Sequence, residues 1–191
     1  MSDLLAASLR SALPEPTVET ERVRVLIPSP LGSLGVEARG DAITRIVIAP
    51  ERRHRARFTP LREVELTDFL EEVVGRLSEY FAGARRNLDL AYDLSGAGLD
   101  PDPFTLRVFE ETVKVPYGTT RTYRRIAAAA GRGSAYRAAR AILTVNPLPI
   151  LVPCHRIVPQ KAGVGTYIAG ARKKDWLLKL ERRVTEGDEA K

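Results

Sequence analysis

Alternating apolar and polar positions indicate short strands in the first half of the chain. Turn-forming residues separate these runs: the segment Pro28 to Gly32 lies between the first two, and Gly40-Asp41 lies between the second and the third. The pattern therefore predicts strands over residues 23–27, 34–38, 43–48 and 88–92.

A helical period replaces this alternation after the third strand. Thr67 can cap a helix, apolar side chains then recur three and four residues apart up to Phe81, and Gly83 can end the helix. The pattern predicts a helix over 68–81, a short N-terminal helix over 1–13 and an arginine-rich surface loop over 50–58.

The segment from Ser95 to Pro103 is rich in glycine, proline and aspartate, which is typical of a linker. Beyond it, helices are expected over 104–114, 122–130, 134–145 and 176–183. The middle two are joined by Gly131 to Gly133, a spacing that fits a helix-turn-helix, although any two packed helices can share it. We expect an α/β N-terminal domain (a small antiparallel sheet plus a helix) over 1–97, a mostly α C-terminal domain over 98–184, and a disordered tail over 185–191.

Charge is distributed unevenly along the 191 residues, whose net charge is +6. Residues 1–100 carry 13 arginines against 16 acidic residues, whereas residues 101–191 carry 17 basic residues against eight acidic ones. A basic C-terminal half favours a nucleic-acid partner, and a merely solvated basic surface is the alternative. No run approaches the roughly 18 apolar residues that span a bilayer, and no signal peptide is recognisable, so a cytoplasmic protein without membrane contact is expected.

Cysteine occurs once, at Cys154, which excludes an internal disulfide and a multi-cysteine zinc site. Only His54 and His155 could add nitrogen ligands, so no metal is expected. An isolated cysteine in such a chain is often a small buried apolar residue. Its neighbours must therefore decide whether it reacts.

Those neighbours favour a reactive thiol. The apolar run 150–152 should be buried, Pro153 ends it, and His155 and Arg156 follow Cys154 directly. A nearby imidazole or guanidinium lowers the thiol pKa from about 8.5, and a thiolate is a soft nucleophile suited to an alkyl carbon. An acid should orient the imidazole, and the sequence alone leaves the choice open among Glu110, Glu111, Asp175 and Glu181. A cysteine hydrolase would use the same groups.

Several segments together resemble one family, the O6-alkylguanine-DNA alkyltransferases, also called methylated-DNA–protein-cysteine methyltransferases. The resemblance covers residues 104–181, and the first half is similar only loosely, at 30–32 and 79–83. It rests on Val115 to Gly118, Thr122-Tyr123, Ala135 to Arg137, Asn146 to Pro149, Pro153 to Ile157, the glycines at 163, 165 and 170 around Tyr167, Lys174 to Leu178, and Glu181.

The resemblance implies a reaction at Cys154. This residue would accept the alkyl group from O6 of guanine, His155 would take the thiol proton through a water, and Glu181 would orient His155. Tyr123 would donate a proton to the guanine ring nitrogen N3, and Asn146 would brace the hinge. The thioether product is stable, so each molecule would act once and without a cofactor.

The resemblance also implies how duplex DNA is bound. Arg137 would fill the space left by the extruded nucleotide, from a helix whose alanines keep it slim enough for the minor groove. Further DNA contacts would come from Thr122, Ala135, Tyr136 and Arg140. The base pocket would be formed by Pro149, Ile157, Tyr167, Ile168 and Lys174. The implied folds are ribonuclease H-like for the first domain and winged-helix-like for the second, and a monomer is expected.

Two positions depart from the family pattern. Ala169 stands where the family usually has glycine, which bears on the tolerance of bulky alkyl groups, and Tyr136 stands where a small residue is common. The competing functions are a non-catalytic binder of alkylated DNA, in which tryptophan usually replaces the cysteine, a cysteine hydrolase, and a helix-turn-helix regulator.

Overall fold

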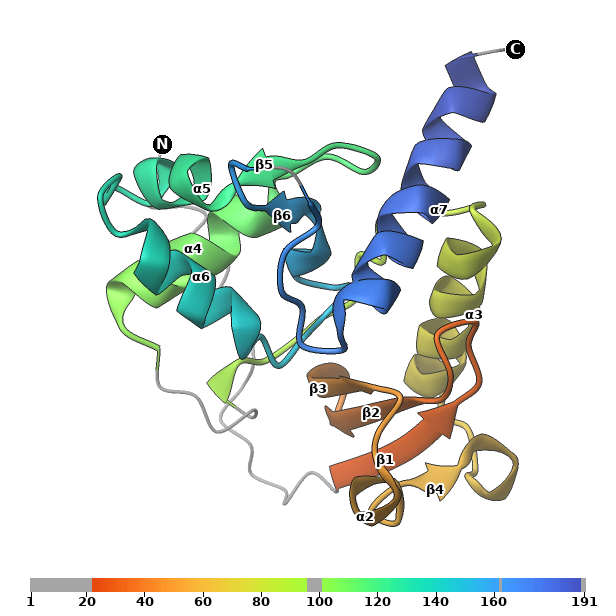
Figure 1. Ribbon diagram of the computed structural model, residues 1–191. Coiled ribbons are helices and arrows are strands. Elements are labelled where there is room, and N and C mark those ends of the chain that lie inside the picture. Colours follow the sequence, from red (N-terminus) through yellow and green to blue (C-terminus); the bar gives the residue numbers. More distant parts are fainter. Residues whose placement is uncertain (1–21, 96–100, 162, 190–191) are drawn as a thin grey trace.

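The first half of the chain is built on a small mixed sheet, as a computed structural model that describes residues 22–95, 101–161 and 163–189 shows (Figure 1). The strand order is β3-β2-β1-β4, with β1 antiparallel to β2 and β2 antiparallel to β3. The strands span Arg22–Ile27 (β1), Leu34–Arg39 (β2), Ala42–Ile48 (β3) and Thr59–Pro60 (β4). Because β4 runs parallel to β1, the sheet is mixed and the expectation of a purely antiparallel sheet is wrong.

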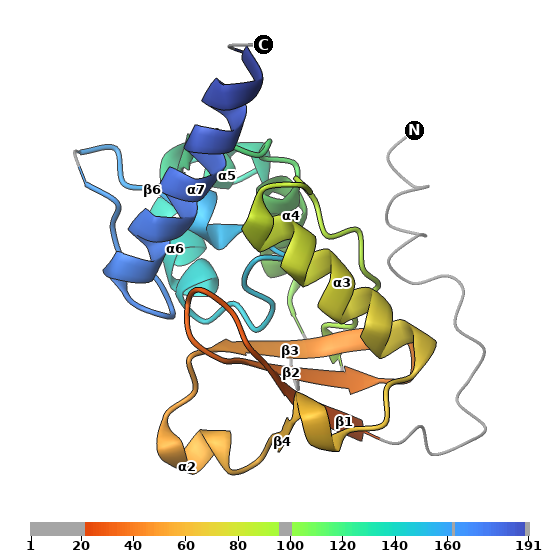
Figure 2. The ribbon, with the colours of Figure 1, turned by 90° about the vertical axis from the view of Figure 1, so that its right-hand side faces the viewer.

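One face of this sheet is covered by α3, Asp68–Ala82, as Figure 2 shows. Thr67 caps this helix by accepting a hydrogen bond from the Leu70 amide, and Gly83 ends it in a left-handed conformation. The buried side of α3 consists of Leu70, Val73, Leu77 and Tyr80. Two short elements flank the sheet, α2 (Arg52–Arg55) and the 3₁₀ helix η1 (Leu61–Glu63).

The second half is mostly helical. It contains α4 (Pro103–Val113), α5 (Tyr123–Ala129), α6 (Tyr136–Thr144) and α7 (Ala171–Glu189). A two-stranded parallel pair, β5 (Arg121–Thr122) with β6 (Ile157–Val158), lies beside α5, and the 3₁₀ helix η3 (Cys154–Arg156) precedes β6. Helices α5 and α6 pack together as the helix-turn-helix pattern predicted.

Helix α7 links the two halves, because it packs on η3 and also lies beside α3 (Figure 1). The ring centroids of Phe81 and Trp176 are 6.1 Å apart, and an added Cβ at Gly83 would lie 2.6 Å from a Val184 methyl. This packing carries the helix on to Glu189, so the expectation of a disordered tail from residue 185 is wrong as far as that residue.

Other segments differ from the sequence prediction. Residues 88–92 form no strand: only Tyr92 makes an isolated bridge, to Ile43, although Leu88 and Leu90 are buried. The arginine-rich loop contains the short helix α2. The helix predicted over 1–13 lies outside the described residues. None of the helices in the described ranges is long and apolar enough to cross a bilayer.

Candidate active site

The loop from Asn146 to Pro153 holds the only cysteine against a buried amide. The Asn146 Nδ2 donates to Val152 O at 2.9 Å and to Cys154 Sγ at 3.1 Å. The Asn146 Oδ1 accepts from the Leu148 amide at 3.0 Å. Ile150 in this loop has a φ of 80°, which is strained for a β-branched residue. The fully buried Asn146 therefore holds an unusual loop and the sulfur atom at the same time.

Cys154 begins the 3₁₀ helix η3, directly after the buried run that Pro153 ends. This tight turn buries Cys154, His155 and Arg156 together. His155 Nε2 lies 2.8 Å from Glu181 Oε1. The other ring nitrogen, Nδ1, is buried and has no hydrogen-bond partner among the described residues.

Glu181 on α7 is the centre of a buried polar network. Its carboxylate accepts from Arg156 Nε and Nη2 at 2.9–3.2 Å and from the Gly118 amide at 3.0 Å. Gly118 has a φ of 74°, and an added Cβ would lie 2.2 Å from Thr185 Oγ1, so only glycine brings this N–H so close to α7. Of the four acids that the sequence left open, the structure thus places Glu181 beside the imidazole.

Two members of this network were not predicted as site residues. Tyr80, on α3 of the N-terminal half, donates its hydroxyl to Glu181 Oε1 at 2.7 Å and lies 3.5 Å from His155 Nε2. Arg156 also donates to Val115 O at 2.8 Å. The only signal for Tyr80 was its place on the apolar face of a predicted helix, three residues after Leu77. A polar tip on such a face needs a buried partner.

Burial controls the protonation of the nucleophile. It raises the pKa of the Cys154 thiol to about 11, although the Asn146 hydrogen bond and the charge of Lys174 oppose the shift. The sequence-based expectation of a lowered thiol pKa is therefore wrong for the free protein, because burial outweighs the groups that favour the thiolate. The thiol needs a base when it reacts.

The hydrogen-bonded pair of His155 and Glu181 is suited to supply that base. Burial lowers the pKa of His155, so its ring is neutral at pH 7. Burial opposes ionisation of Glu181, but the hydrogen bond from His155 and the hydrogen bonds and charge of Arg156 outweigh it and lower the pKa of the carboxyl to about 2. An ionised Glu181 accepts the proton of Nε2, which leaves Nδ1 as the basic nitrogen of His155.

Removing the Tyr80 hydroxyl should weaken this network from the N-terminal side. We expect Tyr80→Phe to lower the free energy of unfolding by about 1.5–3 kcal/mol, the range for a hydrogen bond to a charged group. Unfolding in urea measures this, with Tyr92→Phe as a control that removes a hydroxyl remote from Glu181. Equal stability of the two variants would contradict the assigned contact.

Tyr123 and Lys174 lie close to the sulfur. Burial raises the pKa of Tyr123, so its phenol keeps its proton, and burial lowers the pKa of Lys174 to about 8. The Lys174 ammonium lies 5.7 Å from the Tyr123 ring centroid and donates to Ile157 O at 2.5 Å and Thr166 O at 3.2 Å. Lys174 thereby ties the loop before α7 to β6.

A cavity of about 600 Å³ opens between the helix-turn-helix and the loop after β6. Tyr123 lines it together with Tyr136 and Arg140, so the cavity lies between α6 and a side chain that is close to the sulfur. Arg137, Ala138 and Ala141 form an exposed stripe along α6. The lining residues are Tyr123, Arg124, Tyr136, Arg140, Pro159, Gln160, Lys161, Gly165 and Thr166.

The other residues predicted for the site lie in different surroundings, some buried near Cys154 and some at the surface. Thr122 caps α5, and Ala135 precedes α6. Tyr167 is buried and forms a T-shaped ring pair with His155, at 6.3 Å between centroids. Pro149 and Ile157 are buried close to Cys154 along the chain, whereas Ile168 is 46% exposed and lines a second cavity, on the N-terminal side. Among the described residues, no group of three or more potential metal ligands occurs.

Comparison with known proteins agrees with this arrangement. Residues 103–183 match the family described as "6-O-methylguanine DNA methyltransferase, DNA binding domain". The constitutive methylated-DNA–protein-cysteine methyltransferase of Bacillus subtilis is 35% identical over 160 residues, which is 81% of this chain and 92% of that protein. The chain belongs to the methylated-DNA–protein-cysteine methyltransferases.

Solved structures extend the family match to most of the chain. The O6-methylguanine methyltransferase of Mycobacterium tuberculosis is 30% identical, with a TM-score of 0.71 over 85% of this chain and 94% of that one. The same TM-score and identity are found for the M. tuberculosis protein in complex with DNA, over 84% and 93% of the two chains. The overall fold of this methyltransferase is therefore similar to that of these relatives over most of the chain.

Proposed function

We propose that this protein repairs DNA by direct reversal, moving an alkyl group from O6 of guanine to its own Cys154. The observation that carries the proposal is the buried thiol beside a neutral imidazole, which is itself held by an ionised carboxylate. Curated relatives across the chain are named for transfer from methylated DNA to a protein cysteine. A non-catalytic binder of the same fold would have no use for this thiol and its buried base.

The thiol proton leaves toward His155. In the proposal, one water molecule joins the Cys154 thiol to Nδ1 of His155, the buried nitrogen that has no partner among the described residues. The neutral ring accepts the proton, and Glu181 stabilises the imidazolium that forms. The thiolate therefore forms only when the water molecule and the neutral imidazole of His155 are in place to accept the proton.

Carbon transfer is a single displacement. The Cys154 sulfur forms a bond to the alkyl carbon as the bond from carbon to O6 of guanine breaks. Tyr123, whose phenol is protonated, donates to N3 of the guanine, so that neutral guanine leaves. Lys174 stabilises the thiolate and the tyrosine by its nearby charge. Pro149, Ile157, Tyr167 and Ile168 complete the proposed base pocket.

The proposed DNA surface is α6 with its flanking residues. Double-stranded DNA would lie with its minor groove on the exposed alanines, and Arg137 would fill the gap left by the extruded base. Thr122, Ala135, Tyr136 and Arg140 would contact the backbone beside it. We also propose a ribonuclease H-like domain over residues 1–97 and a winged-helix-like domain over residues 98–184. The protein would act as a cytoplasmic monomer without a metal or cofactor.

Arg137→Ala should separate base extrusion from chemistry. The cost of leaving the gap in the stack is a few kcal/mol, so we expect transfer from duplex DNA to slow by about 10- to 100-fold. Transfer from a free O6-alkylguanine base should not change, because no stack is opened. Single-turnover rates with both substrates measure this, and Arg132→Ala in the preceding turn is the control. Equal slowing with both substrates would contradict the assigned role.

Intact-protein mass spectrometry tests the function itself. After mixing with a duplex that contains O6-methylguanine, the protein should carry one methyl group in place of the thiol hydrogen, and a duplex with plain guanine should leave its mass unchanged. A binder would gain nothing from either duplex. A hydrolase would turn over without lasting modification, so either result would refute the proposal.

A further inference from the structure

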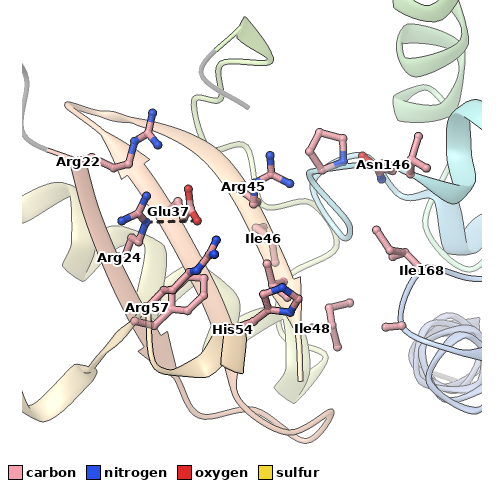
Figure 3. A pocket seen from close by; sticks show the side chains of 15 residues that line it. Arg22, Arg24, Glu37, Arg45, Ile46, Ile48, His54, Arg57, Asn146 and Ile168 are labelled. Carbon is pink, nitrogen blue, oxygen red and sulfur yellow. Dashed lines mark ion pairs between the residues drawn. The ribbon is translucent and has the colours of Figure 1, made fainter. Parts of the chain in front are cut away.

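The outer face of the N-terminal sheet carries a basic cavity that the proposed reaction does not use. Its volume is about 540 Å³, and side chains from β1, β3 and the segment after β3 point into it (Figure 3). The basic residues that line it are Arg22, Arg24, Arg45, His54 and Arg57, and Glu37 is the one acidic residue of the lining.

Strand register and one aromatic ring build this surface. Arg24, Glu37 and Arg45 are cross-strand neighbours on β1, β2 and β3, so they form a row on the face opposite the α3 side. The Phe58 ring packs on Gly35, where an added Cβ would lie 2.6 Å from it. Because Phe58 is buried there and β4 pairs with β1 directly after it, Arg57 is held at the edge of the cavity.

The charge of the cavity is not neutralised by its own residues. Glu37 pairs with Arg24 at 3.4 Å. Arg22 and Arg57 are exposed and form no ion pair with an acidic residue in the parts of the chain that the structure describes. Four guanidinium groups thus face one carboxylate, within a half of the chain where acidic residues outnumber basic ones.

The opposite wall of the cavity belongs to the active site. It contains Val145, Asn146 and Pro147, which follow α6 directly, together with Ile168 and Ala169 from the loop before α7. The β3 residue Ile46 donates its amide to Pro147 O at 2.8 Å, which fixes the sheet beside this wall. Asn146 is also the residue whose amide contacts the Cys154 sulfur. The basic surface therefore continues from the end of the DNA-facing helix.

We propose that this cavity is a second DNA contact, in which Arg22 and Arg57 bind the phosphodiester backbone of the same duplex that delivers its base to Cys154. This inference rests on the proposed function for the identity of the duplex. Guanidinium groups suit phosphate because their paired N–H donors match its oxygens. The N-terminal half would then add affinity for DNA next to the C-terminal end of α6. Although this half carries more acidic than basic residues, it would bind DNA through one local basic surface.

Salt dependence of binding tests the proposal. The double variant Arg22→Gln/Arg57→Gln should reduce the slope of log affinity against log salt by about 1.8, since each lost phosphate contact removes about 0.9. Between 50 and 200 mM salt, its affinity should therefore fall by about tenfold less than that of the unchanged protein. The matched control is Arg53→Gln/Arg62→Gln, which removes the same charge outside the cavity, from arginines beside Glu51 and Glu63. The measurement uses a duplex too short for two protein molecules.

The outcomes separate this inference from the proposed function. A slope equal to that of the control would overturn the second contact, even if methyl transfer is normal. An effect seen only on longer duplexes would place the contact on a neighbouring molecule's DNA and would also overturn it. Transfer from a free O6-alkylguanine base should be unchanged in the double variant, and absence of transfer in the unchanged protein would refute the proposed function but not the binding result.

Discussion

Cys154→Ser should abolish alkyl transfer and leave affinity for duplex DNA nearly unchanged. A serine hydroxyl is far less acidic and less polarisable than a thiol, so the imidazole of His155 cannot turn it into a comparable nucleophile. The Asn146 amide can still donate to the serine oxygen, so the loop should persist. Because Cys154 is only 3% exposed, the proposed DNA contacts should not depend on its sulfur.

Single-turnover transfer and fluorescence anisotropy with the same duplex give the two readouts for this variant. The unchanged protein serves as the reference, and since Cys154 is its only cysteine, any thioether must form there. Retained transfer in Cys154→Ser would remove the sulfur from the reaction. Loss of DNA binding together with transfer would show that the division of roles between η3 and α6 is wrong.

Glu181→Gln should have the largest effect on stability. The change removes the only acidic partner of the buried Arg156 guanidinium among the described ion pairs, which leaves an uncompensated charge. Breaking a buried pair in this way costs about 3–5 kcal/mol. Transfer should also slow strongly, because the imidazolium of His155 loses the carboxylate that stabilises it. Chemical unfolding at pH 7 measures the first effect, and Glu186→Gln, exposed on the same helix, is the control.

The ionisation of Glu181 should make the free energy of unfolding depend on pH. Its pKa falls from the usual 4.5 to about 2 on folding, so its contribution is present above pH 4.5 and is lost as the pH falls toward 2. His155 acts in the same direction, because burial lowers its pKa and protonation then favours the unfolded chain. Glu181→Gln should therefore lose less stability than the unchanged protein between pH 5 and pH 2. Parallel pH profiles would contradict this account.

Secondary structure followed from the sequence wherever the local pattern was long. The three main strands and the helix beginning at Asp68 lie close to their predicted bounds because alternation and capping are local signals. The strand β4 has only two residues, one of them a proline, and no pattern can predict it. Residues 88–92 have the alternating pattern of a strand, and their leucines are buried. Only Tyr92 makes a bridge to another strand, however, so these leucines are buried without regular strand pairing.

The active site was predictable in its chemistry and not in its full network. Cys154 and His155 are adjacent in sequence, and the family resemblance added Glu181, 26 residues from His155. Tyr80 lies 101 residues from Glu181 and comes from the other half of the chain, so only the folded structure brings its hydroxyl to the carboxylate. The raised thiol pKa was missed for a related reason, because burial is a property of the whole fold.

The most direct test of the central claim is the stoichiometry of transfer with excess substrate. The protein is mixed with an excess of duplex that contains O6-methylguanine, and the restored guanine and the methylated Cys154 peptide are both quantified over time. We expect one guanine restored and one methylated Cys154 per chain, with no further reaction after fresh DNA is added. Continued turnover, or restored guanine with an unmodified Cys154, would contradict it.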